Sequence, residues 1–161
     1  MTRNRWRAIV AALCVVGLPA SAHADLTAFV GASPTSAVRL GRGISAGMGL
    51  VVVGFEIELA QLVERADDDA AALSTGMANV IVQTPIDVSR MQFYGTTGVG
   101  VYRETLGALQ ETSVGGNLGG GVKIRVTGPL KLRLDYRLFR LRGAPVTATY
   151  HRVYAGATLG F

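Results

Sequence analysis

The sequence predicts an all-β fold, an eight-stranded antiparallel up-and-down transmembrane β-barrel. Eight segments alternate apolar and polar residues with a period of two, which is typical of strands with two chemically different faces. The chain has 21 glycines in 161 residues, and each glycine inside a helix costs about 1 kcal/mol relative to alanine, which disfavours a helical bundle. The connections between the segments alternate in length, as they do in barrels that cross a membrane.

The N-terminus predicts an export signal ahead of the first strand. A basic start with three arginines, an apolar run, and the Ala-x-Ala site of Ala22 and Ala24 make residues 1–24 a signal peptide. Cleavage is expected after Ala24, which leaves a barrel domain over residues 25–161.

The mature chain has little net charge and no cysteine. Without residues 1–24 it holds 13 Lys and Arg against 11 Asp and Glu, and Cys14 is removed with the signal. Nucleic-acid binding therefore loses its electrostatic support, and disulfides and thiolate metal sites are excluded. We expect no cofactor.

The first four strands are expected at residues 26–33, 43–50, 51–61 and 73–84. Alternation is strict in the third, where Val53, Phe55 and other apolar residues oppose Gly54, Glu56 and Glu58, and it is weaker in the other three. Residues 56–73 are rich in Ala, Glu and Leu and could also form a helix. We favour a strand followed by a loop, because a helix would interrupt the even number of strands.

The last four strands are expected at residues 91–103, 114–126, 130–138 and 152–161. The pattern is clearest in Leu130–Leu138, where apolar residues alternate with Lys131, Arg133, Asp135 and Arg137. No helix could pack that sequence as one apolar face. The final segment repeats the pattern up to Phe161.

Turn-forming residues fill the intervals between the strands. The expected connections are residues 34–42, 49–52, 64–72, 85–89, 104–111, 127–129 and 142–149. The first, third, fifth and seventh are longer than the second and sixth, as in a barrel with long outward loops and short periplasmic turns.

The position of the glycines predicts which face lies inside. A narrow closed lumen has little room for side chains, and the charged face is also the one rich in glycine. These glycines are Gly54, Gly98, Gly100, Gly115, Gly119, Gly121, Gly156 and Gly160. We therefore expect small and polar residues to face inward and apolar residues to face lipid, the reverse of a soluble barrel.

Aromatic residues near the segment ends are expected to form girdles where the membrane meets water. They are Phe29, Phe93, Tyr102, Tyr136, Tyr150 and Phe161.

The inward face predicts a buried ion network. Glu56 and Glu58 lie on the third strand, and Arg133, Asp135 and Arg137 lie on the seventh, which is diametrically opposite in a ring of eight. Lumen side chains of so narrow a barrel meet across it. Lys123, Arg125 and Lys131 are expected to join the network lower down. The network either plugs the lumen or acts as a switchable gate for small ions.

Residues 25–161 resemble the small OmpA-type outer-membrane barrels of Gram-negative bacteria, and three segments carry the resemblance most specifically. They are Val53–Glu58, Leu132–Arg137, and the terminal Phe161 preceded by Val153, Ala155, Ala157 and Leu159. The terminal residues look like the assembly signal of that family, which implies the barrel-assembly machinery as a partner and the outer membrane as the destination.

The predicted role is that of a non-enzymatic outer-membrane protein, structural or engaged in surface interaction. It would be monomeric and in contact with lipid and lipopolysaccharide. A small gated ion or solute pore is the alternative, and a secreted soluble ligand-binding barrel comes third.

Three further features of the sequence do not lead to an assigned site. His151 is the only histidine of the mature chain, but no serine lies near it on the last strand, so no catalytic residue is assigned. Asp67–Asp69 lacks the spacing of a dedicated calcium loop, and no metal site is assigned. Gly115–Gly121 lacks the lysine of a phosphate-binding loop and is interpreted as barrel wall.

Overall fold

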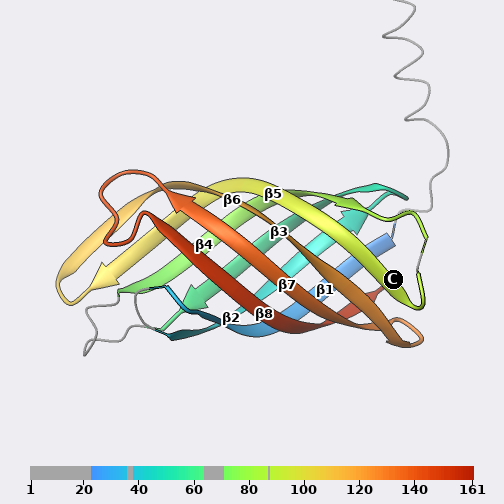
Figure 1. Cartoon of the computed structure of the whole chain (residues 1–161). Coiled ribbons are helices and arrows are strands. Elements are labelled where there is room, and N and C mark those ends of the chain that lie inside the picture. Colours follow the sequence, from blue (N-terminus) through green and yellow to red (C-terminus); the bar gives the residue numbers. More distant parts are fainter. Residues whose placement is uncertain (1–22, 36–37, 64–70, 87) are drawn as a thin grey trace, which may run out of the picture.

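The computed structural model describes residues 23–35, 38–63, 71–86 and 88–161, which form one closed β-barrel (Figure 1). Each strand pairs antiparallel with the next, and β8 pairs with β1 to close the ring. This confirms the fold class predicted from the alternation. The strands are β1 (His23–Ser33), β2 (Arg39–Gly49), β3 (Val53–Leu62), β4 (Ala72–Gln83), β5 (Met91–Leu106), β6 (Leu109–Thr127), β7 (Leu130–Leu141) and β8 (Thr149–Gly160).

Within the described ranges, no helix has the length and apolarity needed to cross a membrane. The alternative of a helix over residues 56–73 is wrong where the structure describes that stretch, because β3 continues to Leu62 and β4 begins at Ala72. The start of the barrel lies close to the predicted cleavage site. β1 begins at His23, while residues 1–22, including Ala22, lie outside the described residues.

The two ends of the barrel carry different connections. We call the end with the β1–β2, β3–β4, β5–β6 and β7–β8 connections the distal end, and the other the proximal end. The expected fifth connection, residues 104–111, is wrong. β5 runs to Leu106 and β6 begins at Leu109, because Gly107, with φ +58°, adopts the left-handed conformation that a two-residue hairpin turn requires.

Apolar side chains cover the outside of the barrel, and charged side chains fill the inside. Leu132, Leu134 and Leu159 are 40%, 42% and 42% exposed, whereas Arg133 and Arg137 are 1% and 0% exposed. Side chains alternate along each strand, so one parity faces the lumen throughout.

Glycine gives the lumen side chains their space. A Cβ placed on Gly121 would lie 2.1 Å from the carbonyl oxygen of Leu134 and 2.6 Å from the hydroxyl of Tyr94. Any larger residue there would displace a strand or a ring of the lumen.

The prediction of an aromatic girdle is wrong for three of its six residues. Phe93, Tyr136 and Phe161 lie on the outside, but Phe29, Tyr102 and Tyr150 are buried in the lumen. These three occupy the inward parity of their strands. Phe29 stacks on Tyr154 with ring centroids 4.2 Å apart, and Tyr150 stacks on Phe139 at 4.7 Å.

Candidate functional site

The centre of the lumen is an ion network built across the barrel. Glu56 on β3 accepts hydrogen bonds from the guanidinium groups of Arg133 and Arg137 on β7, the latter at 2.8 Å. The ring closes in sequence order, so β3 and β7 lie on opposite walls. Both arginines are buried, and the contacts therefore join the two walls in the absence of bulk water.

Asp135 holds the same two arginines from their own strand. Its carboxylate oxygens lie 3.2 Å from Nη2 of Arg133 and 3.0 Å from Nε of Arg137. The hydroxyl groups of Tyr94 on β5 and Tyr154 on β8 also donate to this carboxylate. Residues of β5, β7 and β8 therefore hold the side chains of Arg133, Asp135 and Arg137 in place.

A third arginine completes the charge balance. Arg152 on β8 donates to Glu58, whose other oxygen lies 2.9 Å from Nη1 of Arg137. Three guanidinium groups therefore face three carboxylates. Arg152 was not among the residues predicted for the network, although it lies on the polar face of the last strand and alternation alone would have placed it inside.

Neutral side chains extend the network on the β3 side. Ser45 donates to Glu56 at 3.1 Å, and the amide of Asn79 approaches the other oxygen at 3.4 Å. Asn117 in turn donates to Asn79 at 2.8 Å. These residues and the two tyrosines were missed because polar neutral residues carry no distinctive sequence signal.

A smaller charged group lies toward the proximal end. Lys123 and Lys131 both donate to Asp25 near the start of β1, the second at 3.2 Å. Asp25, Glu56 and Lys123 border a cavity of about 20 Å³. Arg125, which was expected in the network, has an exposed side chain and lies beside a register shift between residues 125 and 127 in the pairing of β6 with β7.

An apolar layer occupies the lumen on the distal side of the network. Most of its members lie near the distal ends of their strands, Met77 lies midway along β4, and all are at most 4% exposed. They are Leu62, Leu73, Met77, Tyr102, Phe139, Leu141 and Tyr150. This layer separates the ion network from the distal opening.

The remaining predicted residues lie outside the lumen. Val153, Ala155, Ala157, Leu159 and Phe161 face outward on β8 or directly after it. Ala24 lies at the start of β1, where its N–H donates to the carbonyl of Phe161 at 3.2 Å. Residues 115–121 belong to β6 and are barrel wall, and Asp67–Asp69 lie outside the described residues.

His151 lies on the outer surface near the distal end. Its Nδ1 is 2.6 Å from the hydroxyl of Tyr136, and its backbone N–H donates to the hydroxyl of Thr35 at 2.9 Å. Within the part of the chain that the structure describes, no serine or carboxylate is hydrogen-bonded to the imidazole.

Comparison with solved structures places the barrel among eight-stranded outer-membrane folds. Neisserial surface protein A matches with a TM-score of 0.69 and 20% identity, covering 87% of this chain and 97% of that chain. The N-terminal β-barrel domain of Pseudomonas aeruginosa OprF matches with a TM-score of 0.65 and 13% identity, covering 86% and 97%. At these identities the likeness establishes the fold.

The same fold also supports catalysis in another protein. The outer membrane enzyme PagL matches with a TM-score of 0.54 and 9% identity, covering 84% of this chain and 98% of that chain. The fold alone therefore does not decide between an enzyme and a non-enzyme. Neither a scan of protein-family models nor a search of curated proteins found a match.

Proposed function

We propose that this chain is a monomeric, non-enzymatic outer-membrane β-barrel whose lumen is plugged by its charged network and whose role is structural or one of surface interaction. The observation that supports the proposal most strongly is the inverted distribution of side chains. Leucines that a water-soluble barrel would bury face outward, while Arg133, Arg137 and Glu58 are at most 1% exposed.

A membrane is the solvent that fits this surface. Exposed apolar area costs about 25 cal/mol per Å² in water, and hydrocarbon removes that cost. Closure of the ring also satisfies the backbone groups that an open sheet edge would leave unpaired in lipid. A soluble ligand carrier would need a polar exterior and an apolar internal cavity, and this barrel has the opposite arrangement.

The membrane assignment is tested by extraction and gel migration. The protein should stay with the outer-membrane fraction after salt and alkaline washes, dissolve with detergent, and migrate faster unheated than boiled. Release by buffer without detergent would contradict the membrane assignment. Equal migration before and after boiling would contradict a stable closed barrel.

The plug rests on two successive barriers. A permeating ion would have to separate paired charges in the network and then cross the apolar layer of Leu62, Leu73, Phe139 and their neighbours. Breaking a buried ion pair costs about 3–5 kcal/mol. The lumen is therefore expected to be closed at rest.

A small gated pore is the second candidate, and one observation favours it. Arg137 contacts Glu56, Glu58 and Asp135 together, so its guanidinium could exchange partners without losing all of its charge pairing. Single-channel recording in planar bilayers should compare the wild type with Glu56→Ala, and with Glu111→Ala as a control outside the network. Silence from all three discards the gate, whereas openings that Glu56→Ala alone alters would overturn the plug.

The non-enzymatic assignment rests on the surroundings of His151. A catalytic imidazole needs a nucleophile within reach and a group that orients it. The Tyr136 hydroxyl at 2.6 Å is an ordinary surface partner on the lipid-facing side. Purified protein incubated with lipid A and examined by mass spectrometry should leave the lipid unchanged, and a product lost on His151→Phe would refute the assignment.

A further inference from the structure

Five polar side chains form one row across the outside of the barrel near the distal end. Each residue is the register partner of the next on the neighbouring strand, from β2 to β6, and all five are exposed. In order they are Arg42, Gln61, Ser74, Arg103 and Thr112.

The rows immediately toward the proximal end are apolar. The next outward-facing row is Ile44, Leu59, Gly76, Val101 and Val114. The row after it is Ala46, Ile57, Ala78, Val99 and Gly116. The polar row therefore lies on the distal side of the apolar wall, where hydrocarbon gives way to lipid headgroups in the proposed membrane.

Small residues on β4 leave a groove below the polar row. A Cβ on Gly76 would make ordinary van der Waals contacts with Leu59 at 3.5 Å and Val101 at 3.8 Å, so the missing side chain leaves a shallow dip between these two residues. Ala78 continues this low surface along β4.

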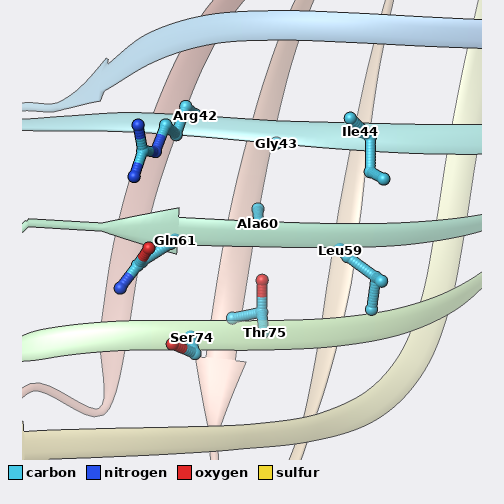
Figure 2. Close-up of a pocket in the computed structure, with 8 residues that line it drawn as sticks. All are labelled: Arg42, Gly43, Ile44, Leu59, Ala60, Gln61, Ser74 and Thr75. Atoms are coloured by element: carbon cyan, nitrogen blue, oxygen red, sulfur yellow. The ribbon is translucent and has the colours of Figure 1, made fainter.

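Two pockets follow this part of the surface. The first, of about 490 Å³, is bordered by Arg42, Gln61 and Ser74 as well as by Ile44 and Leu59. Figure 2 shows Arg42 and Gln61 extending toward one side of this pocket and Ile44 and Leu59 lying toward the other. The second, of about 450 Å³, continues over residues 46–48, 55–57 and 78–80. Polar groups thus lie at one end of an apolar path.

The two arginines make the polar row positively charged, which favours binding of an anion. Among the residues that the structure describes, Arg42 and Arg103 have no carboxylate partner within 4 Å. They lie on β2 and β5, three strand spacings apart, which is about 14 Å. Between them, the Gln61 amide and the Ser74 hydroxyl can donate further hydrogen bonds. One phosphate reaches one arginine, whereas a headgroup with two separated phosphates reaches both.

The geometry points to a binding site for a lipid that carries two phosphate groups on an acylated sugar headgroup. Its phosphates lie on Arg42 and Arg103, and one acyl chain lies in the groove along Gly76 and Ala78. This inference rests on the proposed membrane location and adds a ligand site on the outer wall. The lipid would come from the membrane leaflet that surrounds the distal end of the barrel.

Native mass spectrometry of the detergent-solubilised protein tests the site. The protein is mixed with equal amounts of diphosphoryl lipid A, monophosphoryl lipid A or phosphatidylglycerol, and separately with inorganic phosphate. The wild type should retain diphosphoryl lipid A in preference to the two single-phosphate lipids and should retain no phosphate alone. Equal retention of all three lipids, or retention of phosphate alone, would overturn the proposal.

Charge-removing variants locate the contact. Arg42→Gln and Arg103→Gln should each weaken retention of diphosphoryl lipid A about fivefold, as expected for one cation at an anionic headgroup, and the double variant about 25-fold. Arg90→Gln, an exposed arginine in the proximal β4–β5 connection, is the matched control and should behave as the wild type. Equal loss in the control, or none in the double variant, would refute the assignment. Heat-modifiable migration of every variant shows separately whether the barrel itself has formed.

Discussion

Replacing Glu56 with glutamine should destabilise the barrel by about 3 kcal/mol, the lower end of the cost of removing one partner from a buried ion pair. Glu56 is 4% exposed and holds Arg133 and Arg137, so its loss leaves three guanidinium groups facing two carboxylates. The lower end applies because glutamine keeps an oxygen that can still accept from Ser45 or Asn79.

A second substitution separates charge from shape. Arg133→Met in the Glu56→Gln background restores the balance of charges at two against two. The double variant should therefore be more stable than the sum of the two single losses predicts, by about 1–3 kcal/mol of coupling. Glu111→Gln makes the same change of a carboxylate to an amide, but in the distal β5–β6 hairpin. Its free energy of unfolding should stay within about 0.5 kcal/mol of that of the wild type.

Urea unfolding in lipid vesicles measures these differences. Far-UV circular dichroism and heat-modifiable migration are the suitable signals, because the one tryptophan of the chain is Trp6, in the predicted signal peptide. Single variants within about 1 kcal/mol of the wild type, or a double variant that equals the sum, would mean that water screens these charges separately. The plugged lumen would then be wrong.

Three further predictions concern the wall. Leu134 is 42% exposed on the outer face, and Leu134→Arg should lower the free energy of unfolding by about 2–4 kcal/mol. Thr112→Arg, in the polar row, should lower it by at most about 1 kcal/mol. Equal losses for the two variants in vesicle unfolding would refute the assignment of apolar residues to the lipid-facing side. Gly121→Ala should cost about 1–3 kcal/mol, because its Cβ would meet the Leu134 carbonyl at 2.1 Å, while Gly95→Ala, whose nearest neighbour is 3.9 Å away, should be neutral in the same assay. Phe161→Ala should lower the amount of folded protein that accumulates in cells, measured by unheated gel migration, and an unchanged amount would argue against an assembly signal.

The face of each network residue could be predicted from the sequence because strand side chains alternate strictly. Once Leu132 and Leu134 are taken as outward, Arg133 and Asp135 must point inward, and closure of eight strands in order places Glu56 on the wall opposite. No knowledge of distances was needed for these assignments.

Height along the barrel axis could not be predicted in the same way. It depends on strand tilt and on where pairing ends, and alternation carries neither. Arg125 lies beside a register shift near the proximal end and is exposed, although its parity matches that of Lys123. Likewise, the β5–β6 hairpin extends to Leu106 and Leu109 because one residue, Gly107, permits a tight turn.

The apolar layer was missed for a different reason. The inward face was expected to be polar over its whole length, but a lumen too narrow for bulk water packs apolar groups as readily as ion pairs. Leu62 and Leu73 have the inward parity of β3 and β4, and each is at most 3% exposed. Parity predicts position, whereas the chemistry that a closed lumen accepts changes from layer to layer.

A plugged lumen, as proposed, would constrain where any partner can bind. Three arginines are matched by three carboxylates, an apolar cluster packs on the distal side, and the cavity beside Asp25 and Glu56 has about 20 Å³, room for about one water molecule. In the proposed plug, a solute would have to unpair buried charge in order to enter. Groups that can meet a partner at no such cost therefore lie on the exterior, where Arg42 and Arg103 stand above an apolar groove and the β5–β6 hairpin exposes Leu109 at its tip. If the protein has a ligand-dependent role, substitutions on this outer surface should change it while those in the lumen change stability alone.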